Sequence, residues 1–227
     1  MEDKNLLKDS KAYYEDNDYY EIFSNCEDSK DEIKKLFREI SKNKIVLDAG
    51  CGTGKFIDVL EENSSKYIGI DLSSKQLEKA KAKSKKTSSL FINSNLSNIE
   101  LEDNSIDLIV SNWVLGTITD LDEREKCLQE LKRVLKPNGS IYLIENAENS
   151  EFEYIRNHTT DSRTKDYNTW ILKHGFDTYR RINTYFEFET LEIAQKCFNV
   201  IYGEEISSKI KNRIIEHEII TFKYIKK

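Results

Sequence analysis

Short apolar runs alternate with stretches of helical periodicity over residues 30–146. The runs have the length and the β-branched content of buried strands, and they cover residues 44–48, 66–71, 89–93, 105–112 and 140–146. Apolar residues three and four positions apart predict helices over residues 30–41, 54–63, 73–86 and 121–136. Strands that alternate with helices in this way form a parallel sheet with right-handed crossovers and helices on both faces.

The pattern changes beyond residue 147. Residues 147–175 are polar and show no strand pattern, whereas residues 178–189 and 216–225 alternate as strands around a helix at 190–202. Because no helical crossover of equal weight separates these two late strands, they predict an antiparallel edge of the sheet. At the other end of the chain, residues 1–25 are polar and rich in tyrosine. They predict one or two helices outside the sheet.

Glycine is concentrated at one point of the chain. Gly50, Gly52 and Gly54 lie in VLDAGCGTG, directly after a predicted strand and before a predicted helix. In an open parallel sheet this turn lies at the carboxyl end of the strand, where ligands bind, and the amides at the helix start carry positive partial charge. Asp71 ends the next predicted strand, where a carboxylate can accept both hydroxyls of a ribose. Together these features predict an adenosine-containing ligand.

Two common nucleotide-binding motifs do not fit this turn. The dinucleotide fingerprint requires a third glycine where this chain has Lys55. The phosphate loop G-x-x-x-x-G-K-[ST] does not occur in the sequence. The turn therefore argues against both a nicotinamide dinucleotide and a Walker-type nucleotide site.

Composition narrows the class of protein further. A length of 227 residues with 38% hydrophobic content suits one domain with a modest insertion. The formal charge of −6 argues against a dedicated nucleic-acid binder, and no apolar run is long enough to cross a membrane. The four cysteines have no paired spacing, which argues against a zinc site or a disulfide framework. With no secretion signal evident, we expect a cytoplasmic protein.

Residues 44–146 resemble the core of the class I S-adenosylmethionine-dependent methyltransferases of the small type 11 group. The resemblance rests on four segments in the order typical of the family, VLDAGCGTG (46–54), YIGIDLS (67–73), NLSNIELEDNSIDLIVSNWVLGTI (95–118) and LKRVLKPNGSIYLIEN (131–146). It implies S-adenosylmethionine as cofactor. It also implies a Rossmann-like seven-stranded, mostly parallel sheet with helices on both faces and an antiparallel last strand.

The resemblance divides the chain into three segments. Residues 1–43 would form an N-terminal helical cap, and residues 44–146 would form the cofactor-binding core. Residues 147–227 would form a substrate-lid insertion and the antiparallel strands that complete the same domain. Residues 1–25 and 147–190 lie outside the matched core, so we expect them to set substrate choice.

The resemblance also implies a cofactor role for individual residues. Gly50 and Gly52 would border the methionine part of the cofactor, Asp71 would hold the ribose, and Leu72 would lie against the adenine ring. Asn95 stands where the family commonly has an aspartate that accepts a hydrogen bond from the adenine amino group, so it would bring no charge there. The remaining positions are Leu96, whose backbone amide would face the ring, and Asn112, which would lie near the transferred methyl group.

The catalytic and acceptor-binding residues are less closely specified. A methyl group on a sulfonium is already activated, so an in-line displacement needs mainly positioning, with a general base only if the nucleophile is protonated. The candidate bases are Glu145 and His158. Candidate residues of the substrate pocket are the aromatic side chains Tyr14, Tyr20, Trp113, Tyr167 and Trp170, each of which also fits a purely structural role.

Three hypotheses about the acceptor follow. An acidic chain without a nucleic-acid-binding module favours a small molecule. The second hypothesis is a protein or peptide acceptor docked on the segment 147–190. The third is a protein that binds S-adenosylmethionine without transferring its methyl group.

Overall fold

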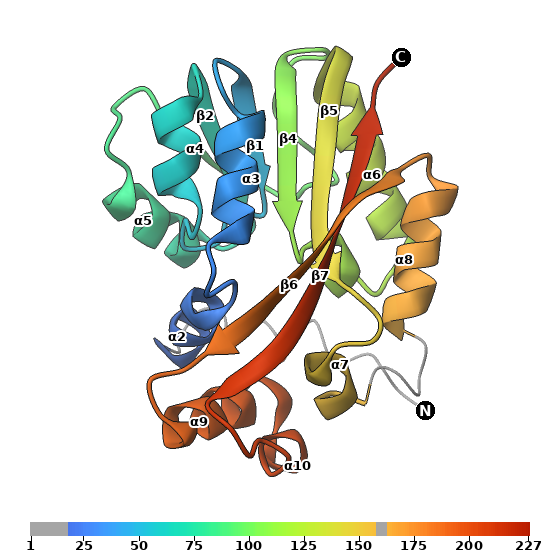
Figure 1. The fold of residues 1–227 in the computed structure, drawn as a ribbon. Helices are drawn as coiled ribbons and strands as arrows, with labels where there is room; N and C mark the ends of the chain where they lie inside the picture. The colour runs from blue at the N-terminus through green and yellow to red at the C-terminus, as the bar shows by residue number, and fades with distance from the viewer. Residues whose placement is uncertain (1–17, 158–162) are drawn as a thin grey trace. The chain divides into compact units, whose positions relative to one another are not determined.

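The strands form a single mixed sheet. The computed structural model describes residues 18–157 and 163–227. Within these residues, seven strands pair in the order β3-β2-β1-β4-β5-β7-β6 (Figure 1). Their bounds are β1 (Ile45–Ala49), β2 (Lys66–Asp71), β3 (Leu90–Asn93), β4 (Ile106–Asn112), β5 (Leu135–Asn146), β6 (Asp177–Glu187) and β7 (Ile214–Ile225). Strands β1 to β5 pair in parallel and the last strands are antiparallel, which confirms the predicted fold class.

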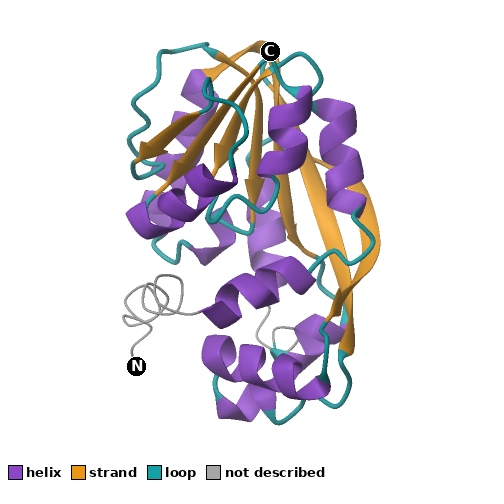
Figure 2. Cartoon of the chain, turned by 90° about the vertical axis from the view of Figure 1, so that its left-hand side faces the viewer, coloured by secondary structure: helices purple, strands orange, loops and turns teal. Residues whose placement is uncertain are grey.

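Helices flank the parallel strands on both sides (Figure 2). Their bounds are α2 (Asp18–Cys26), α3 (Glu32–Ile40), α4 (Ile57–Asn63), α5 (Ser74–Lys83), the 3-10 turn η1 (Leu115–Thr117), α6 (Leu121–Val134), α7 (Glu151–Ile155), α8 (Arg163–Lys173), α9 (Leu191–Tyr202) and α10 (Glu204–Ser207). The predicted helices of the core are all present, with ends that differ by a few residues. No helix among the described residues has the length and apolar character needed to cross a bilayer.

The start of β5 differs from the prediction. The strand was expected from residue 140, after a turn at Pro137 and Gly139, but it begins at Leu135. Ile106 of β4 pairs with Leu135, whereas Leu108 pairs with Ser140, so residues 136–139 form a bulge within the strand. Lys226 exchanges two backbone hydrogen bonds with Asn138 and Gly139, which keeps the bulge in the sheet.

The polar segment 147–175 contains two helices that its sequence pattern did not indicate. The first, α7, begins after Ser150, whose hydroxyl accepts a hydrogen bond from the Glu153 amide as a helix cap. The second, α8, has only a weak apolar stripe. Its buried side chains are Asn168 and Ile171. No strand occurs in the described part of this segment.

The described residues divide into two compact units. Unit 1 takes those within Met1–Glu32, Asn146–Trp170 and Arg181–Ile220, and unit 2 takes Ile33–Glu145, Ile171–Arg180 and Thr221–Lys227. Helix α3, which lies in the predicted N-terminal cap by sequence, clusters with the parallel strands in unit 2.

Each unit has its own apolar core. In unit 2, the apolar stripe of α3 and the strand residues of β1 are fully buried. In unit 1, phenylalanines from α2, α7, β6 and α9 pack around one another; the cluster includes Phe23, Phe152, Phe186, Phe188 and Phe198. Their ring centroids lie between 4.7 and 6.4 Å apart. Burial of this many aromatic side chains accounts for the stability of a unit built from separate chain segments.

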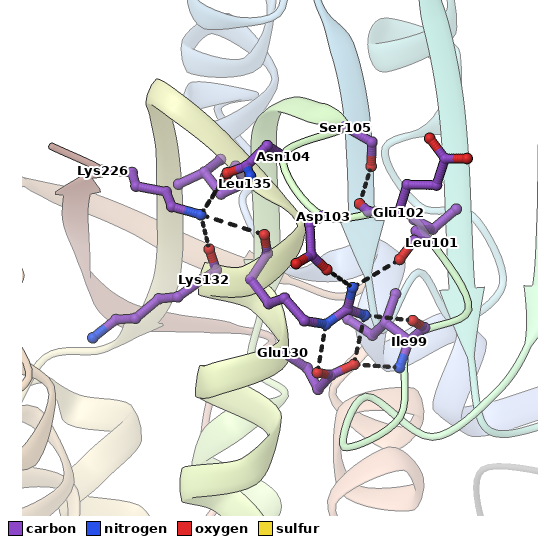
Figure 3. A network of polar contacts seen from close by, with 11 residues as sticks. Ile99, Leu101, Glu102, Asp103, Asn104, Ser105, Glu130, Lys132, Leu135 and Lys226 are labelled. Carbon is purple, nitrogen blue, oxygen red and sulfur yellow. Dashed lines mark hydrogen bonds and ion pairs between the residues drawn. The ribbon is translucent and has the colours of Figure 1, made fainter.

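The end of α6 anchors the loop that precedes β4. Arg133 forms ion pairs with Glu130 at 2.7 Å and Asp103 at 2.6 Å, and it donates to the carbonyls of Ile99 and Leu101 (Figure 3). One guanidinium thus binds the loop at several points. Next to it, the ammonium of Lys226 donates to carbonyls at the end of α6 and to the side chain of Asn104 (Figure 3).

Replacing Arg133 by alanine should destabilise unit 2. We expect the free energy of unfolding to fall by about 1–3 kcal/mol, because several charged hydrogen bonds are lost from a group that is only partly buried. Urea unfolding of the two proteins measures the difference. Lys196→Ala is the control, since it removes an exposed ion pair with Glu192 and should leave the midpoint unchanged. Equal shifts in both variants would contradict the anchoring role of Arg133.

Candidate cofactor site

The glycine turn begins where β1 ends. Gly50, Gly52 and Gly54 have φ values of 80, 53 and 77°, in the left-handed region that favours glycine. The amides of Gly50 and Cys51 both donate to the carbonyl of Ile70, at 2.8 and 2.9 Å. The turn is therefore bound to the end of β2, and α4 begins shortly after it.

The Asp71 carboxylate lies against this turn. It accepts hydrogen bonds from the Gly52 amide at 2.8 Å and from the Ser73 amide at 2.9 Å. Burial raises the pKa of Asp71, while the hydrogen bonds from Ser73 and Gly52 lower it. The predicted pair of glycine turn and carboxylate is thus brought into direct contact at the carboxyl ends of β1 and β2.

The predicted adenine-binding residues follow β2 and β3. The Leu72 side chain is 65% exposed directly after Asp71, so an apolar surface is available there. The side-chain amide of Asn93 donates to the carbonyls of Asp71 and Leu72, which ties this corner to the end of β3.

Asn95 and Leu96 lie in the loop after β3. The Asn95 amide nitrogen donates to Glu123 at 2.8 Å, and its carbonyl oxygen accepts from the Ser97 amide at 3.0 Å. The same oxygen also accepts a weak hydrogen bond from the Cys127 thiol at 4.0 Å, so both of its lone pairs have partners within the chain. Leu96 is buried.

Asn112 ends β4 beside the glycine turn. Val110 pairs with Asp48 of β1, and the Ser111 hydroxyl donates to the Ala49 carbonyl at 2.9 Å. The next residue, Asn112, is therefore level with Gly50. Its Oδ1 atom is buried and accepts no hydrogen bond from any residue that the structure describes. A buried acceptor of this kind is costly unless a ligand or water supplies a donor.

The chain after β4 turns back onto the glycine turn. Trp113 has a φ of 54°, an unusual conformation for a bulky side chain. A β-carbon on Gly50 would lie 2.3 Å from Cγ2 of Val114, so Val114 occupies the space that glycine leaves open. The Lys55 ammonium lies 5.3 Å from the centre of the Trp113 ring. This contact joins the start of α4 to the end of β4.

These residues fit an adenosine cofactor. The glycine turn offers backbone without side chains, Asp71 offers a carboxylate, and the buried Oδ1 of Asn112 lacks a donor within the described chain. The predicted residues Gly50, Gly52, Asp71, Leu72, Asn95, Leu96 and Asn112 all belong to unit 2. In the described ranges, no group of histidine, cysteine and acidic side chains could hold a metal ion.

The candidate catalytic and acceptor-binding residues are distributed over both units. Glu145, near the end of β5, is buried and belongs to unit 2 with Trp113. Tyr20, Tyr167 and Trp170 belong to unit 1, where the rings of Tyr167 and Trp170 stack 6.0 Å apart. Tyr14 and His158 lie outside the described residues.

Unit 1 contains a polar cavity of about 460 Å³. The side chains around it come from β6, β7 and the start of α7, namely Asn149, Ser150, Asn183, Thr184, Tyr185, Glu216, His217 and Glu218. Its lining combines carboxylates, amides, one tyrosine ring and the buried His217. None of these residues was indicated by the sequence, because they carry no motif and are distant from one another along the chain.

One buried carboxyl group, for which the sequence predicts a role in ordering the glycine turn rather than in contacting the ligand, lies just before that turn. Asp48 of β1 accepts a hydrogen bond from the Tyr67 hydroxyl at 3.0 Å, and both side chains are buried. Burial raises the pKa of Asp48 to about 7, against the lowering effect of the Tyr67 hydrogen bond. A glycine within the strand KYIGID was the available signal, since glycine inside a strand marks a close approach.

The raised pKa of Asp48 makes stability depend on pH. Between about pH 4 and pH 7 the folded chain retains a proton that the unfolded chain, with a pKa of 3.8, has lost. The contribution of Asp48 to the free energy of unfolding is therefore greatest below pH 4 and falls as pH rises to 7. The slope approaches about 1.4 kcal/mol per pH unit. Urea unfolding at pH 5, 6 and 7 should show the difference between wild type and Asp48→Asn shrinking by this slope. A constant difference would contradict the assignment.

Comparison with known proteins supports the interpretation of unit 2. Residues 47–143 match the methyltransferase domain family. The chain is 34% identical over 100 residues to malonyl-[acyl-carrier protein] O-methyltransferase of Hamiltonella defensa, covering 44% of this chain and 37% of the relative. It is 31% identical over 113 residues to the ubiquinone/menaquinone biosynthesis C-methyltransferase UbiE of Campylobacter jejuni, covering 47% of this chain and 46% of the relative. The chain thus spans less than half the length of these curated relatives.

Solved structures show the same fold over almost the whole chain. The N-methyltransferase NodS from Bradyrhizobium japonicum, in complex with S-adenosyl-L-homocysteine, aligns with a TM-score of 0.65 at 13% identity, covering 98% of this chain and 99% of that one. The YcgJ protein from Bacillus subtilis aligns with a TM-score of 0.61 at 16% identity, covering 86% and 97%. Taken together, these findings show that residues 47–143 match the methyltransferase domain family and that the chain has the fold of the class I methyltransferases, with S-adenosylmethionine as the cofactor.

Proposed function

We propose that this protein transfers the methyl group of S-adenosylmethionine to a small-molecule acceptor. The observation that carries the proposal is the contact between the glycine turn and Asp71 at the carboxyl ends of adjacent parallel strands, with the unsatisfied Oδ1 of Asn112 on the next strand. This is the place in an open α/β sheet where a nucleotide ligand binds.

The residues of unit 2 divide the binding of the cofactor among them. Gly50 and Gly52 would border its methionine part, Asp71 would accept from the ribose hydroxyls, and Leu72 would cover one face of the adenine. The side chain of Asn95 and the amide of Leu96 would face the adenine edge, and Asn112 would accept near the methyl group. When bound, the cofactor supplies an activated methyl group. The protein positions the reacting groups and excludes water.

The protein must supply a general base only if the nucleophile of the methyl-accepting molecule carries a proton. Glu145 is our candidate within the described residues, because it is a buried carboxyl near the carboxyl end of β5. His158 is the second candidate, on sequence grounds alone.

We assign recognition of the methyl acceptor to unit 1, which includes most of the described residues in the segments 1–25 and 147–190. The matched methyltransferase domain ends at residue 143, so the polar cavity and the aromatic residues Tyr20, Tyr167 and Trp170 lie outside it. The names of two curated relatives refer to phosphoethanolamine and to ubiquinone/menaquinone biosynthesis. These names favour a small molecule, and a cavity of about 460 Å³ has the volume for one.

Transfer of labelled methyl groups into a cell extract tests the proposal. The protein, S-adenosylmethionine labelled in its methyl group and the extract are incubated together, and the products are separated by mass. We expect label in the small-molecule fraction, and much less of it with Asp71→Ala as the cofactor-binding control at the same cofactor concentration. Label only in protein would replace the small-molecule acceptor by a protein acceptor. Binding of the cofactor without any transfer would show a non-catalytic protein.

A further inference from the structure

Gly69 leaves a notch in β2, where the buried side chains of Asp48, Cys51 and Tyr67 lie close together beneath the glycine turn. Asp48 pairs with Gly69 in the parallel register of β1 and β2, and Val46 pairs with Tyr67. Tyr67 and Asp48 are therefore diagonal neighbours on one face of the sheet. A β-carbon on Gly69 would lie 2.9 Å from the sulfur of Cys51 and 3.1 Å from the hydroxyl of Tyr67. The missing side chain of Gly69 is what lets the Tyr67 hydroxyl reach Asp48.

The Tyr67 hydroxyl lies between the Asp48 carboxyl and the Cys51 thiol and hydrogen-bonds with both. Its ring is 2% exposed and packs against Phe91 of β3, with centroids 5.8 Å apart. The hydroxyl donates to Oδ2 of Asp48 at 3.0 Å. Asp48 in turn lies two residues before Gly50, so the pair lies at the end of β1 that leads into the glycine turn.

We infer that Tyr67 is a positioning residue of the cofactor site, whose hydroxyl holds the Asp48 carboxyl beneath the glycine turn and thereby couples cofactor affinity to the charge on that carboxyl. The inference rests on the proposed function, because it concerns the binding of S-adenosylmethionine. It adds Tyr67, which lies outside the glycine segment 46–54, and assigns an electrostatic role to Asp48, which lies within that segment.

Ionisation of Asp48 should favour the cofactor over the product. S-adenosylmethionine carries a net charge of plus one, because its sulfonium adds to a balanced ammonium and carboxylate, whereas S-adenosylhomocysteine lacks the sulfonium. A negative Asp48 therefore attracts the cofactor more than the product. The titratable groups that act on Asp48 are Tyr67, Asp71 and Cys51, and Glu61 acts on Tyr67. Burial holds the pKa of the Cys51 thiol well above its usual range, so the thiol stays neutral.

The sign of the pH dependence follows from the pKa of Asp48, which burial raises to about 7. Below pH 7 the carboxyl is mostly neutral, and above it the carboxylate is mostly formed. Affinity for S-adenosylmethionine should thus increase by about fivefold from pH 6 to pH 8, if the pKa of Asp48 falls by about one unit on binding. Affinity for S-adenosylhomocysteine should change less.

Calorimetric titration with both ligands at pH 6, 7 and 8 tests the inference. In Tyr67→Phe the carboxyl loses a charge-stabilising hydrogen bond, so its pKa rises and the midpoint of the affinity increase should move up by about one pH unit. Asp48→Asn should bind with an affinity that does not change over this range. Tyr142→Phe is the matched control, because it removes another buried tyrosine hydroxyl, on β5, and should leave the midpoint where it is.

The outcomes separate the inference from the proposed function. If neither ligand binds to the wild type at any pH, the proposed function fails. If both ligands bind but affinity is independent of pH, or if Tyr67→Phe weakens binding equally at every pH, the positioning role is overturned. Should Tyr67→Phe not fold, proton release from the wild type decides: titration at pH 7 in two buffers of different ionisation enthalpy should show release of a proton fraction that Asp48→Asn lacks. Equal release from both proteins would overturn the inference.

Discussion

Replacing Asp71 by alanine is expected to weaken the binding of S-adenosylmethionine by about 10- to 150-fold. A hydrogen bond to a charged group contributes roughly 1.5–3 kcal/mol, and the loss of one such bond corresponds to this range in the dissociation constant. The carboxylate also accepts from the Gly52 amide, so alanine removes the contact that holds the turn as well. Calorimetry of the purified variant measures the effect.

Two further variants serve as comparisons. One separates the charge of Asp71 from its shape, and the other is a control at a different carboxylate. Asp71→Asn keeps the size of the side chain and one carbonyl oxygen, so it should lose less affinity than alanine. Asp58→Ala removes a half-exposed carboxylate from α4 that pairs with Lys34 and should bind as the wild type does. Unchanged affinity in a folded Asp71→Ala protein would show that another acidic residue holds the ribose.

Replacing Gly50 by alanine is expected to disrupt both the turn and cofactor binding. Its φ of 80° costs alanine about 1–2 kcal/mol. The new β-carbon would lie 2.3 Å from Val114, and overpacking of this kind costs about 1–3 kcal/mol. We expect a loss of about 2–4 kcal/mol in the free energy of unfolding. Displacement of the turn should weaken affinity for S-adenosylmethionine about 100-fold or more.

The contact with Val114 can be tested separately from the backbone strain. The double variant Gly50→Ala with Val114→Ala removes the overlap and should recover part of the lost affinity. Gly203→Ala has a similar φ of 85°, with a ψ of 172° that strongly favours glycine, and no atom lies within 4 Å of the new β-carbon. It should therefore lose about 1–3 kcal/mol of stability from backbone strain alone and no affinity. If Gly50→Ala is no worse than Gly203→Ala in both measurements, the turn is not the cradle of the cofactor.

The sequence predicts the parallel half of the fold because each strand there is a continuous apolar run that ends at a distinctive residue. β1 ends at the glycine turn and β2 ends at Asp71, so both the elements and their functional ends can be recognised. The bulge in β5 could not be predicted, since Pro137 and Gly139 are typical of a turn. Only the pairing with Lys226, far along the chain, keeps these residues in the strand.

The candidate site likewise contains some contacts that the sequence predicts and others that it does not. The contact between Gly52 and Asp71 follows from the order of parallel strands, which places both at one edge of the sheet. The Tyr67–Asp48 pair depends on the notch at Gly69, and Val114 depends on the left-handed turn at Trp113. The cavity of unit 1 joins residues from distant segments. Contacts of this kind depend on tertiary packing rather than on any local pattern.

Calorimetric titration of the wild-type protein with S-adenosylmethionine, S-adenosylhomocysteine and NAD tests the central claim most directly. We expect both adenosyl compounds to bind at pH 8 with dissociation constants in the range typical of small-molecule substrates, roughly micromolar. NAD should give no heat, because Lys55 replaces the third glycine of the dinucleotide fingerprint. Tight binding of NAD, with no heat from either adenosyl compound, would contradict our proposal that this chain is an S-adenosylmethionine-dependent methyltransferase.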